Sequence, residues 1–137
     1  MKARGQKNTR DLKKKALAET IAKEVLECDS SILSLLVVNS RGEVLAVGRS
    51  ERLAKSDYLD ESILPKLGVV AKLITGAADQ ESALLGRMEF LIGAFKNQKI
   101  VLIDVPKHDL SLALRMSRSS IAEYVCNKIG VILAKLV

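Results

Sequence analysis

The pattern of hydrophobic and polar positions between residues 32 and 116, with nearly continuous apolar runs at 32–38 and 100–103 and alternation at 110–116, predicts five strands, two before and three after a single helix. The predicted strands are Ile32–Asn39, Val44–Arg49, Met88–Phe95, Ile100–Val105 and Leu110–Met116, and the helix between them is Ile63–Ala78. Strands within each group are joined by turns too short for a parallel crossover. Further helices are predicted over Thr9–Cys28 and after the serine-rich segment 117–120.

This order predicts an α/β fold of the α+β kind. We expect one three-layer α/β/α domain with a five-stranded antiparallel sheet. The middle helix would cover one face of the sheet, and the N- and C-terminal helices would cover the other. The 137 residues and 14.9 kDa suit a single domain. No apolar run reaches the roughly eighteen residues that cross a bilayer, and we expect a cytoplasmic protein that contacts no membrane.

The predicted middle helix is more apolar than contact with one sheet requires. Its hydrophobic arc covers more than half of the circumference, whereas a helix that rests on its own sheet needs a stripe of roughly 100° or somewhat more. Such an excess predicts a second apolar neighbour. A partner subunit is the preferred interpretation, and a covering loop of the same chain is the alternative.

The excess positive charge lies at the start of the chain. Seven basic residues and Asp11 within residues 1–15 account for the whole formal charge of +6, and the remainder balances at fifteen charges of each sign. We interpret residues 1–9 as a basic, flexible leader and residues 10–137 as the domain. The leader is either a solvated segment or an arm that contacts a polyanion. The candidate contacts are Lys2, Arg4, Lys7, Arg10, Lys13, Lys14 and Lys15.

Residues that could carry catalytic or metal chemistry are sparse. Cys28 and Cys126 are isolated and are expected to be small buried side chains. His108 is the single histidine, with no nucleophile or second base to pair with, and it is assigned no role. The glycines form neither a P-loop nor a dinucleotide fingerprint. We therefore expect no catalytic residue, no cofactor and no metal, and hence no enzyme.

The order of elements resembles the roadblock/dynein light chain family, which belongs with the longin-like and profilin-like folds. The stretch LLVVNSRGEVLAVG, residues 35–48, is similar to the opening hairpin of that family, and residues 88–116 are similar to its three closing strands. Archaeal and bacterial members are the natural comparison. The basic leader and the long first helix depart from the minimal family pattern, and no residue matches a defined GTPase contact.

The resemblance implies a dimer in which the central helices pack together and the third strands pair at the sheet edge. It implies a scaffold, or a regulator of a small Ras-like GTPase, acting as a homodimer or as a heterodimer with a related chain. The expected interface residues are Ile63, Leu67, Val70, Leu73, Ile74, Ala77, Phe90 and Ile92. The alternatives are a small-molecule sensor of profilin-like fold and nucleic-acid binding through the basic segment. With few aromatic residues to stack on bases, nucleic acid is the less favoured partner.

Overall fold

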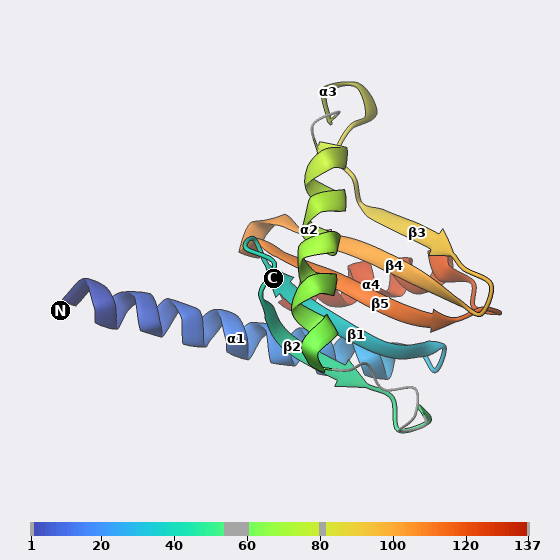
Figure 1. Ribbon diagram of the computed structural model, residues 1–137, viewed down its shortest axis with the longest axis horizontal. Coiled ribbons are helices and arrows are strands. Elements are labelled where there is room, and N and C mark those ends of the chain that lie inside the picture. The colour runs from blue at the N-terminus through green and yellow to red at the C-terminus, as the bar shows by residue number, and fades with distance from the viewer. Residues whose placement is uncertain (1, 54–60, 80–81, 137) are drawn as a thin grey trace.

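The computed structural model describes residues 2–53, 61–79 and 82–136, and these form a sheet with helices on both faces (Figure 1). The helices are α1 (Lys2–Cys28), α2 (Leu64–Asp79), α3 (Ser82–Leu85) and α4 (Ala122–Leu136). The strands are β1 (Ile32–Asn39), β2 (Val44–Arg49), β3 (Phe90–Ala94), β4 (Gln98–Val105) and β5 (Leu110–Ser117). Single 3-10 turns lie at Glu61–Ile63 and Pro106–His108.

The five strands form one antiparallel sheet in the order β2-β1-β5-β4-β3. Both β1 and β4 are interior strands, in agreement with their nearly continuous apolar sequences. Among the described elements, β2 and β3 form the two edges of the sheet. The predicted fold class is confirmed, including the position of β3 at an edge.

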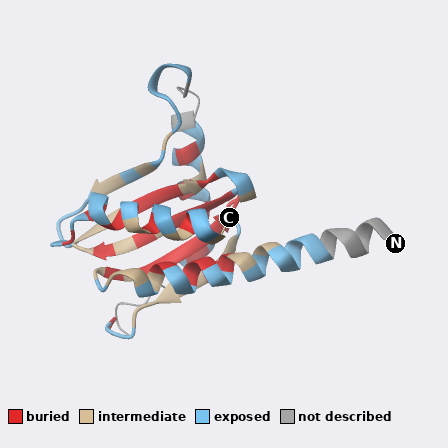
Figure 2. Ribbon diagram, turned by 180° about the vertical axis from the view of Figure 1, so that it is seen from behind, coloured by how far each residue is buried: buried red, intermediate tan, exposed pale blue. Residues whose placement is uncertain are grey.

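The main core lies between the sheet and the layer formed by α1 and α4 (Figure 2). Ile21 of α1 and Ile129 of α4 are fully buried there, together with Leu35 of β1 and Leu114 of β5, which pair across the sheet. Side chains on a strand alternate between faces, so Leu36 and Val38 point to the opposite face. There they form a smaller cluster with Leu64 of α2.

Helix α1 begins at Lys2, whereas the sequence pattern predicted a helix from Thr9. The predicted boundary between leader and domain at residue 9 therefore falls inside α1. Lysine, arginine, glutamine and alanine all favour helices, and residues 2–15 contain no proline, so the helix continues through them. The first half of α1 projects beyond the sheet (Figure 1).

Candidate protein-binding surface

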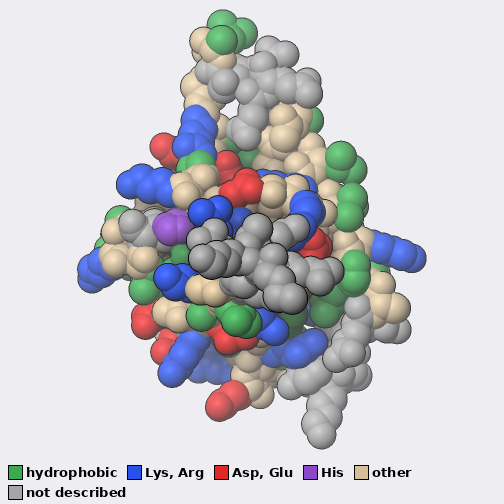
Figure 3. All heavy atoms as spheres, turned by 90° about the vertical axis from the view of Figure 1, so that its left-hand side faces the viewer, with side chains coloured by type: hydrophobic (Ala, Val, Ile, Leu, Met, Phe, Trp, Pro, Cys, Tyr) green, Lys and Arg blue, Asp and Glu red, His purple; other side chains and the backbone are tan. Residues whose placement is uncertain are grey.

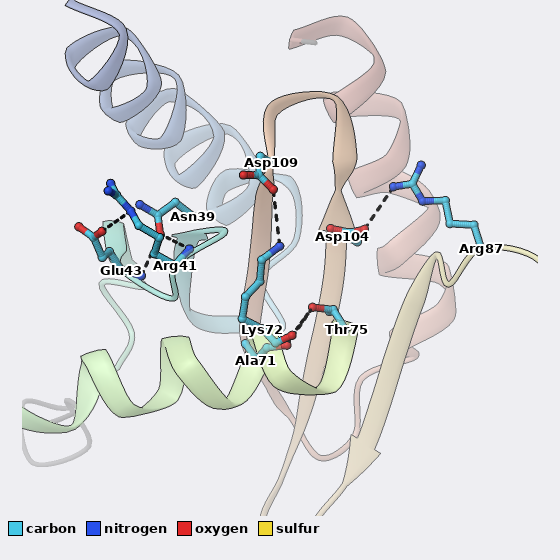
Figure 4. A network of polar contacts seen from close by, with 9 residues as sticks. All are labelled: Asn39, Arg41, Glu43, Ala71, Lys72, Thr75, Arg87, Asp104 and Asp109. Atoms are coloured by element: carbon cyan, nitrogen blue, oxygen red, sulfur yellow. Dashed lines mark hydrogen bonds and ion pairs between the residues drawn. The ribbon is translucent and has the colours of Figure 1, made fainter. Parts of the chain in front are cut away.

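Helix α2 rests on the sheet through a narrow row of small and medium side chains. Leu64, Ala71 and Thr75 are at most 8% exposed, and Gly68 is also buried. Their spacing of four, three and four residues places them on one side of the helix. Thr75 Oγ1 donates hydrogen bonds to the carbonyl oxygens of Ala71 and Lys72, at 3.1 and 3.0 Å, so its hydroxyl is satisfied within the helix (Figure 4).

The opposite side of α2 and the turn that precedes it expose large apolar side chains. We call these residues the outer row: Ile63, Val69, Val70, Leu73 and Ile74, whose exposed fractions lie between 38% and 68%. Leu73 is the most exposed of them, and it lies almost opposite the side that contacts the sheet. Scattered surface hydrophobic residues are ordinary, whereas a contiguous group of this kind is typical of a site that another molecule covers.

An apolar groove of about 370 Å³ runs between α2 and the strands β4 and β5. Helix α2 crosses β2, β1, β5 and β4 and leaves the β3 side of the sheet without a helix above it (Figure 1). The groove is lined mainly by aliphatic side chains from α2 and the sheet: Leu36, Ile63, Leu67, Val70, Ala71, Ile74, Ile100, Leu102, Ala113 and Leu114. It adjoins the outer row, because Ile63, Val70 and Ile74 belong to both.

Three polar residues and one aromatic residue complete the lining of the groove: Ser34, Gln98, Arg115 and Phe95. The Nε–H of Arg115 donates a hydrogen bond to Oε1 of Gln98 at 3.0 Å. Phe95 is 60% exposed, and its ring lies over Gly93, where a Cβ atom would stand 3.3 Å from the ring. The groove thus has an aliphatic floor and an aromatic rim.

Strand β3 borders the groove as an edge strand. It pairs with β4 in a register that sets Leu91 opposite Leu102 and Ile92 opposite Val101. Leu91 is 41% exposed and faces the same side of the sheet as α2. An edge strand presents unpaired backbone groups that a second strand can use. An apolar helix row, a groove and a strand edge therefore occur together on one side of the molecule.

The structure brings six of the eight predicted interface residues together and separates the other two. Leu73 and Ala77 are exposed on the outer side of α2. Leu67, Val70 and Ile74 line the groove beside the helix together with Ile63 of the preceding turn, and Leu67 also packs against the smaller cluster on the sheet. Phe90 and Ile92 face the other side of the sheet and pack against the main core. Alternation along β3 gives the α2 side of the sheet Leu91 instead, and a place for Phe90 and Ile92 in a dimer interface stays a prediction.

Polar contacts hold α2 and the neighbouring turns in place (Figure 4). Nζ of Lys72 lies 4.0 Å from Oδ1 of Asp109 in the turn between β4 and β5. In the β1–β2 turn, Oδ1 of Asn39 accepts hydrogen bonds from the backbone N–H groups of Arg41 and Glu43 at 2.9 and 3.0 Å. This turn reaches α2, so the position of the helix depends on the shape of the turn.

The predicted polyanion contacts lie on the projecting half of α1. Arg10, Lys13 and Lys15 are exposed and Lys14 is half-buried, while Lys2, Arg4 and Lys7 lie outside the side chains that the structure describes. A cleft of about 750 Å³ separates this half of α1 from the β1–β2 turn. Its lining includes side chains of both positive and negative charge: Asp11, Lys14, Lys15, Arg41 and Glu43.

Reactive groups are few in the part of the chain that the structure describes. No group of three or more His, Cys, Asp or Glu that could hold a metal ion occurs among those residues. Burial raises the pKa of the Cys126 thiol to about 11, and burial followed by the nearby Asp29 carboxylate raises the pKa of Cys28. Both thiols are therefore poor nucleophiles at neutral pH. No described helix is long and apolar enough to cross a membrane.

The arrangement, with one antiparallel five-stranded sheet, a central helix on one face and the terminal helices on the other, is similar to that of a solved roadblock/LC7 domain. A roadblock/LC7 domain from Streptomyces avermitilis has a TM-score of 0.67 with this chain at 10% identity, with 86% of this chain and 92% of that chain covered.

Two structures of MglB show the same fold. Gliding protein MglB from Thermus thermophilus gives a TM-score of 0.62 at 16% identity, with 90% and 87% of the two chains covered. A structure of MglB with a tetrameric arrangement gives 0.60 at 14%, with 86% and 88% covered. No protein-family model and no curated protein matches the sequence. At these identities the likeness defines the fold, and the fold prediction is confirmed.

Proposed function

We propose that this protein is a non-catalytic dimerisation module that binds a small Ras-like GTPase as a scaffold or regulator. One observation carries the proposal: the outer row of α2, the groove and the β3 edge lie side by side and are apolar. A surface of this composition is stabilised by covering it, and a second copy of the chain offers the same apolar composition.

A two-fold arrangement fits the proposal. Antiparallel pairing of β3 with the β3 of a second copy would extend the sheet across both subunits. Each α2 would then bring its outer row to the seam, with Leu73 near the centre and the groove accepting side chains of the partner. The MglB structure with a tetrameric arrangement is a solved example of this fold in an oligomer. A heterodimer with a related chain would use the same surface.

The GTPase partner follows from the resemblance to the roadblock family. The chemistry of the described residues agrees with a binding role, because both cysteines are unpaired thiols of raised pKa and no metal-binding group occurs among those residues. The protein would act by presenting a surface to a switch region of the GTPase, with the GTPase supplying its own catalytic groups. Two unpaired thiols also suit the cytoplasm, which we take as its compartment.

Calorimetric titration tests the GTPase part of this proposal. Purified Ras-like GTPases from the same genome, loaded with GDP or with a non-hydrolysable GTP analogue, would be titrated into the wild-type protein. We expect one of them to bind, with an affinity that depends on the nucleotide. The Leu73→Asp variant should bind it more weakly if the dimer is the binding unit. The proposal would be contradicted if, for every GTPase, the GDP-loaded and the GTP-analogue-loaded forms gave the same heat of binding.

A further inference from the structure

The projecting half of α1 is a second surface, which the dimerisation role does not use. Among the side chains of α1 that the structure describes, Ala18 is the first buried one, and the first half of the helix extends past the sheet (Figure 1). We call residues 2–15 the basic arm. At 1.5 Å per residue it is about 21 Å long. The sequence places seven basic residues and one acidic residue on it.

The charge of the arm differs from that of the domain at its base. The domain end from which α1 projects carries Lys, Arg, Asp and Glu side chains intermixed (Figure 3). Arg41 pairs there with Glu43, Nε to Oε1, at 2.7 Å, and Asp11 also lines the cleft. The cleft is therefore not a pocket for a small anion. The excess charge lies along the arm, which suits an extended polyanion.

The basic side chains spread around the helix. At 100° per residue, Arg10, Lys13, Lys14 and Lys15 span roughly 200° of its circumference. Lys14 lies two turns before the fully buried Ile21, so the basic face continues the face that packs on the sheet. The ion pairs found among the described residues join other side chains. A partner that neutralises these cations would have to contact the helix from more than one side.

The helix itself disfavours this charge pattern. The first turns of a helix carry the positive end of its dipole, where cations are unfavourable and anions are favourable. The first turn of α1 contains no acidic residue. Closely spaced like charges on one helix also repel each other. A bound polyanion would remove both penalties.

We propose that the basic arm binds double-stranded DNA by lying in its major groove. That groove is about 12 Å wide and admits an α-helix. Seven basic residues over about 21 Å give one charge per ~3 Å, close to the ~3.4 Å spacing of phosphates along one strand. The two walls of the groove meet the opposite sides of a helix whose cations are spread widely.

Other polyanions fit the arm less well. A helix that lies on a lipid surface needs an apolar face, and Leu12 is the single large apolar residue of residues 2–15. Single strands are held by aromatic stacking, and the arm contains no aromatic residue. The major groove of duplex RNA is deep and narrow, so side chains on a helix cannot use it. Duplex DNA remains the ligand of matching shape and charge.

Fluorescence anisotropy with a labelled DNA duplex of about 20 base pairs, measured from roughly 50 to 200 mM salt, tests the proposal on the full chain. The test variant carries Arg10→Gln, Lys13→Gln, Lys14→Gln and Lys15→Gln, which keep the helix propensity. The matched control removes four exposed cations elsewhere: Lys96→Gln, Lys107→Gln, Arg118→Gln and Lys135→Gln. Both variants have the same net charge, and circular dichroism checks that both are folded.

We expect wild type and control to bind DNA with similar affinity and with a steep salt dependence. The arm variant should bind about 100-fold more weakly at about 0.1 M salt, and its slope of log K against log salt should fall by about 3 to 4, because each lost phosphate contact removes close to one released counterion. The proposal is overturned if the arm variant and the control variant lose the same amount of DNA affinity, or if the wild type does not bind DNA at the lowest salt concentration. Tighter binding to duplex RNA or to phosphatidylserine vesicles than to duplex DNA would also overturn it.

Discussion

The carbonyl oxygen of Gly42 lies where a Cβ atom on residue 68 would have to stand, so the β1–β2 turn and α2 meet backbone to backbone. Gly42 itself has a φ of +78°, which glycine adopts without strain. A Cβ atom at position 42 would in turn approach the Cα atom of Val69 at 3.1 Å. This contact sets the depth at which α2 sits on the sheet, and with it the position of the outer row.

Gly68→Ala should destabilise the fold, because the obstacle is backbone rather than a flexible side chain. Overpacking of this kind typically costs about 1–3 kcal/mol. Gly76→Ala is the matched control in the same helix, since a Cβ atom there meets nothing within 4 Å. It should be neutral or stabilise by up to about 1 kcal/mol through helix propensity. Urea unfolding at one fixed protein concentration measures the free energy of unfolding of both variants. Equal changes in that free energy for Gly68→Ala and Gly76→Ala would contradict the role of the Gly42 contact.

Acid stability should depend on Asp29, which links the end of α1 to α4. Its carboxylate accepts hydrogen bonds from the hydroxyl and the backbone N–H of Ser31, at 2.7 and 2.9 Å, and from Nζ of Lys128 at 3.0 Å. The bonds from Ser31, followed by that from Lys128, lower the pKa of Asp29 from 3.8 to about 2. Because the folded-state pKa is the lower one, this contribution is present above pH 3.8 and is lost as the pH falls towards 2.

Thermal unfolding across that pH range, with Asp29→Asn beside wild type, measures the contribution. The variant should be less stable than wild type near neutral pH, and the difference should shrink as the pH falls from 3.8 to about 2. Ser31→Ala, which removes the hydroxyl donor alone, should give a smaller difference of the same sign. A constant difference between wild type and Asp29→Asn over the whole range would refute the assignment.

Proline at position 94 should weaken the dimer without unfolding the subunit. The N–H of Phe95 donates to the carbonyl oxygen of Gln98, and hydrogen-bonded pairs alternate along an antiparallel ladder. This alternation directs the N–H of Ala94 away from β4, towards a second β3 strand. Ala94→Pro removes that donor alone. Gly93→Pro, one residue earlier, would interrupt the ladder with β4 and should destabilise the subunit itself. Sedimentation velocity measures the loss of the dimer, and circular dichroism measures the loss of folded subunit. We expect Ala94→Pro to change the first alone and Gly93→Pro to change both.

Much of the fold could be predicted because its strands and helices have strong, uninterrupted patterns. The strands Ile32–Asn39 and Val44–Arg49 have the predicted bounds, and the predicted helix Ile63–Ala78 differs from α2 by one residue at each end. Strand β3 is shorter than predicted and β4 is longer. Their pairing across the turn, rather than local hydrophobicity, decides where each of them begins and ends.

The candidate site was predicted only in part, for two physical reasons. Periodicity showed that α2 is apolar on more than one side, but it could not tell which side meets the sheet. That choice follows from Gly68, where the close approach of Gly42 needs a residue without a side chain. On β3, the pattern could not assign a face to Phe90 and Ile92, because side chains on both faces of this strand are apolar.

The central claim concerns the outer row, and the mass of the protein in solution tests it most directly. Leu73→Asp places a charge in the outer row, and Leu12→Asp makes the same change at a leucine of equal exposure, 68%, on α1. Multi-angle light scattering should give about twice the 14.9 kDa chain mass for wild type and for Leu12→Asp, and the single-chain mass for Leu73→Asp. A wild-type protein of single-chain mass at high micromolar concentration, or a Leu73→Asp variant that keeps the doubled mass, would contradict the account.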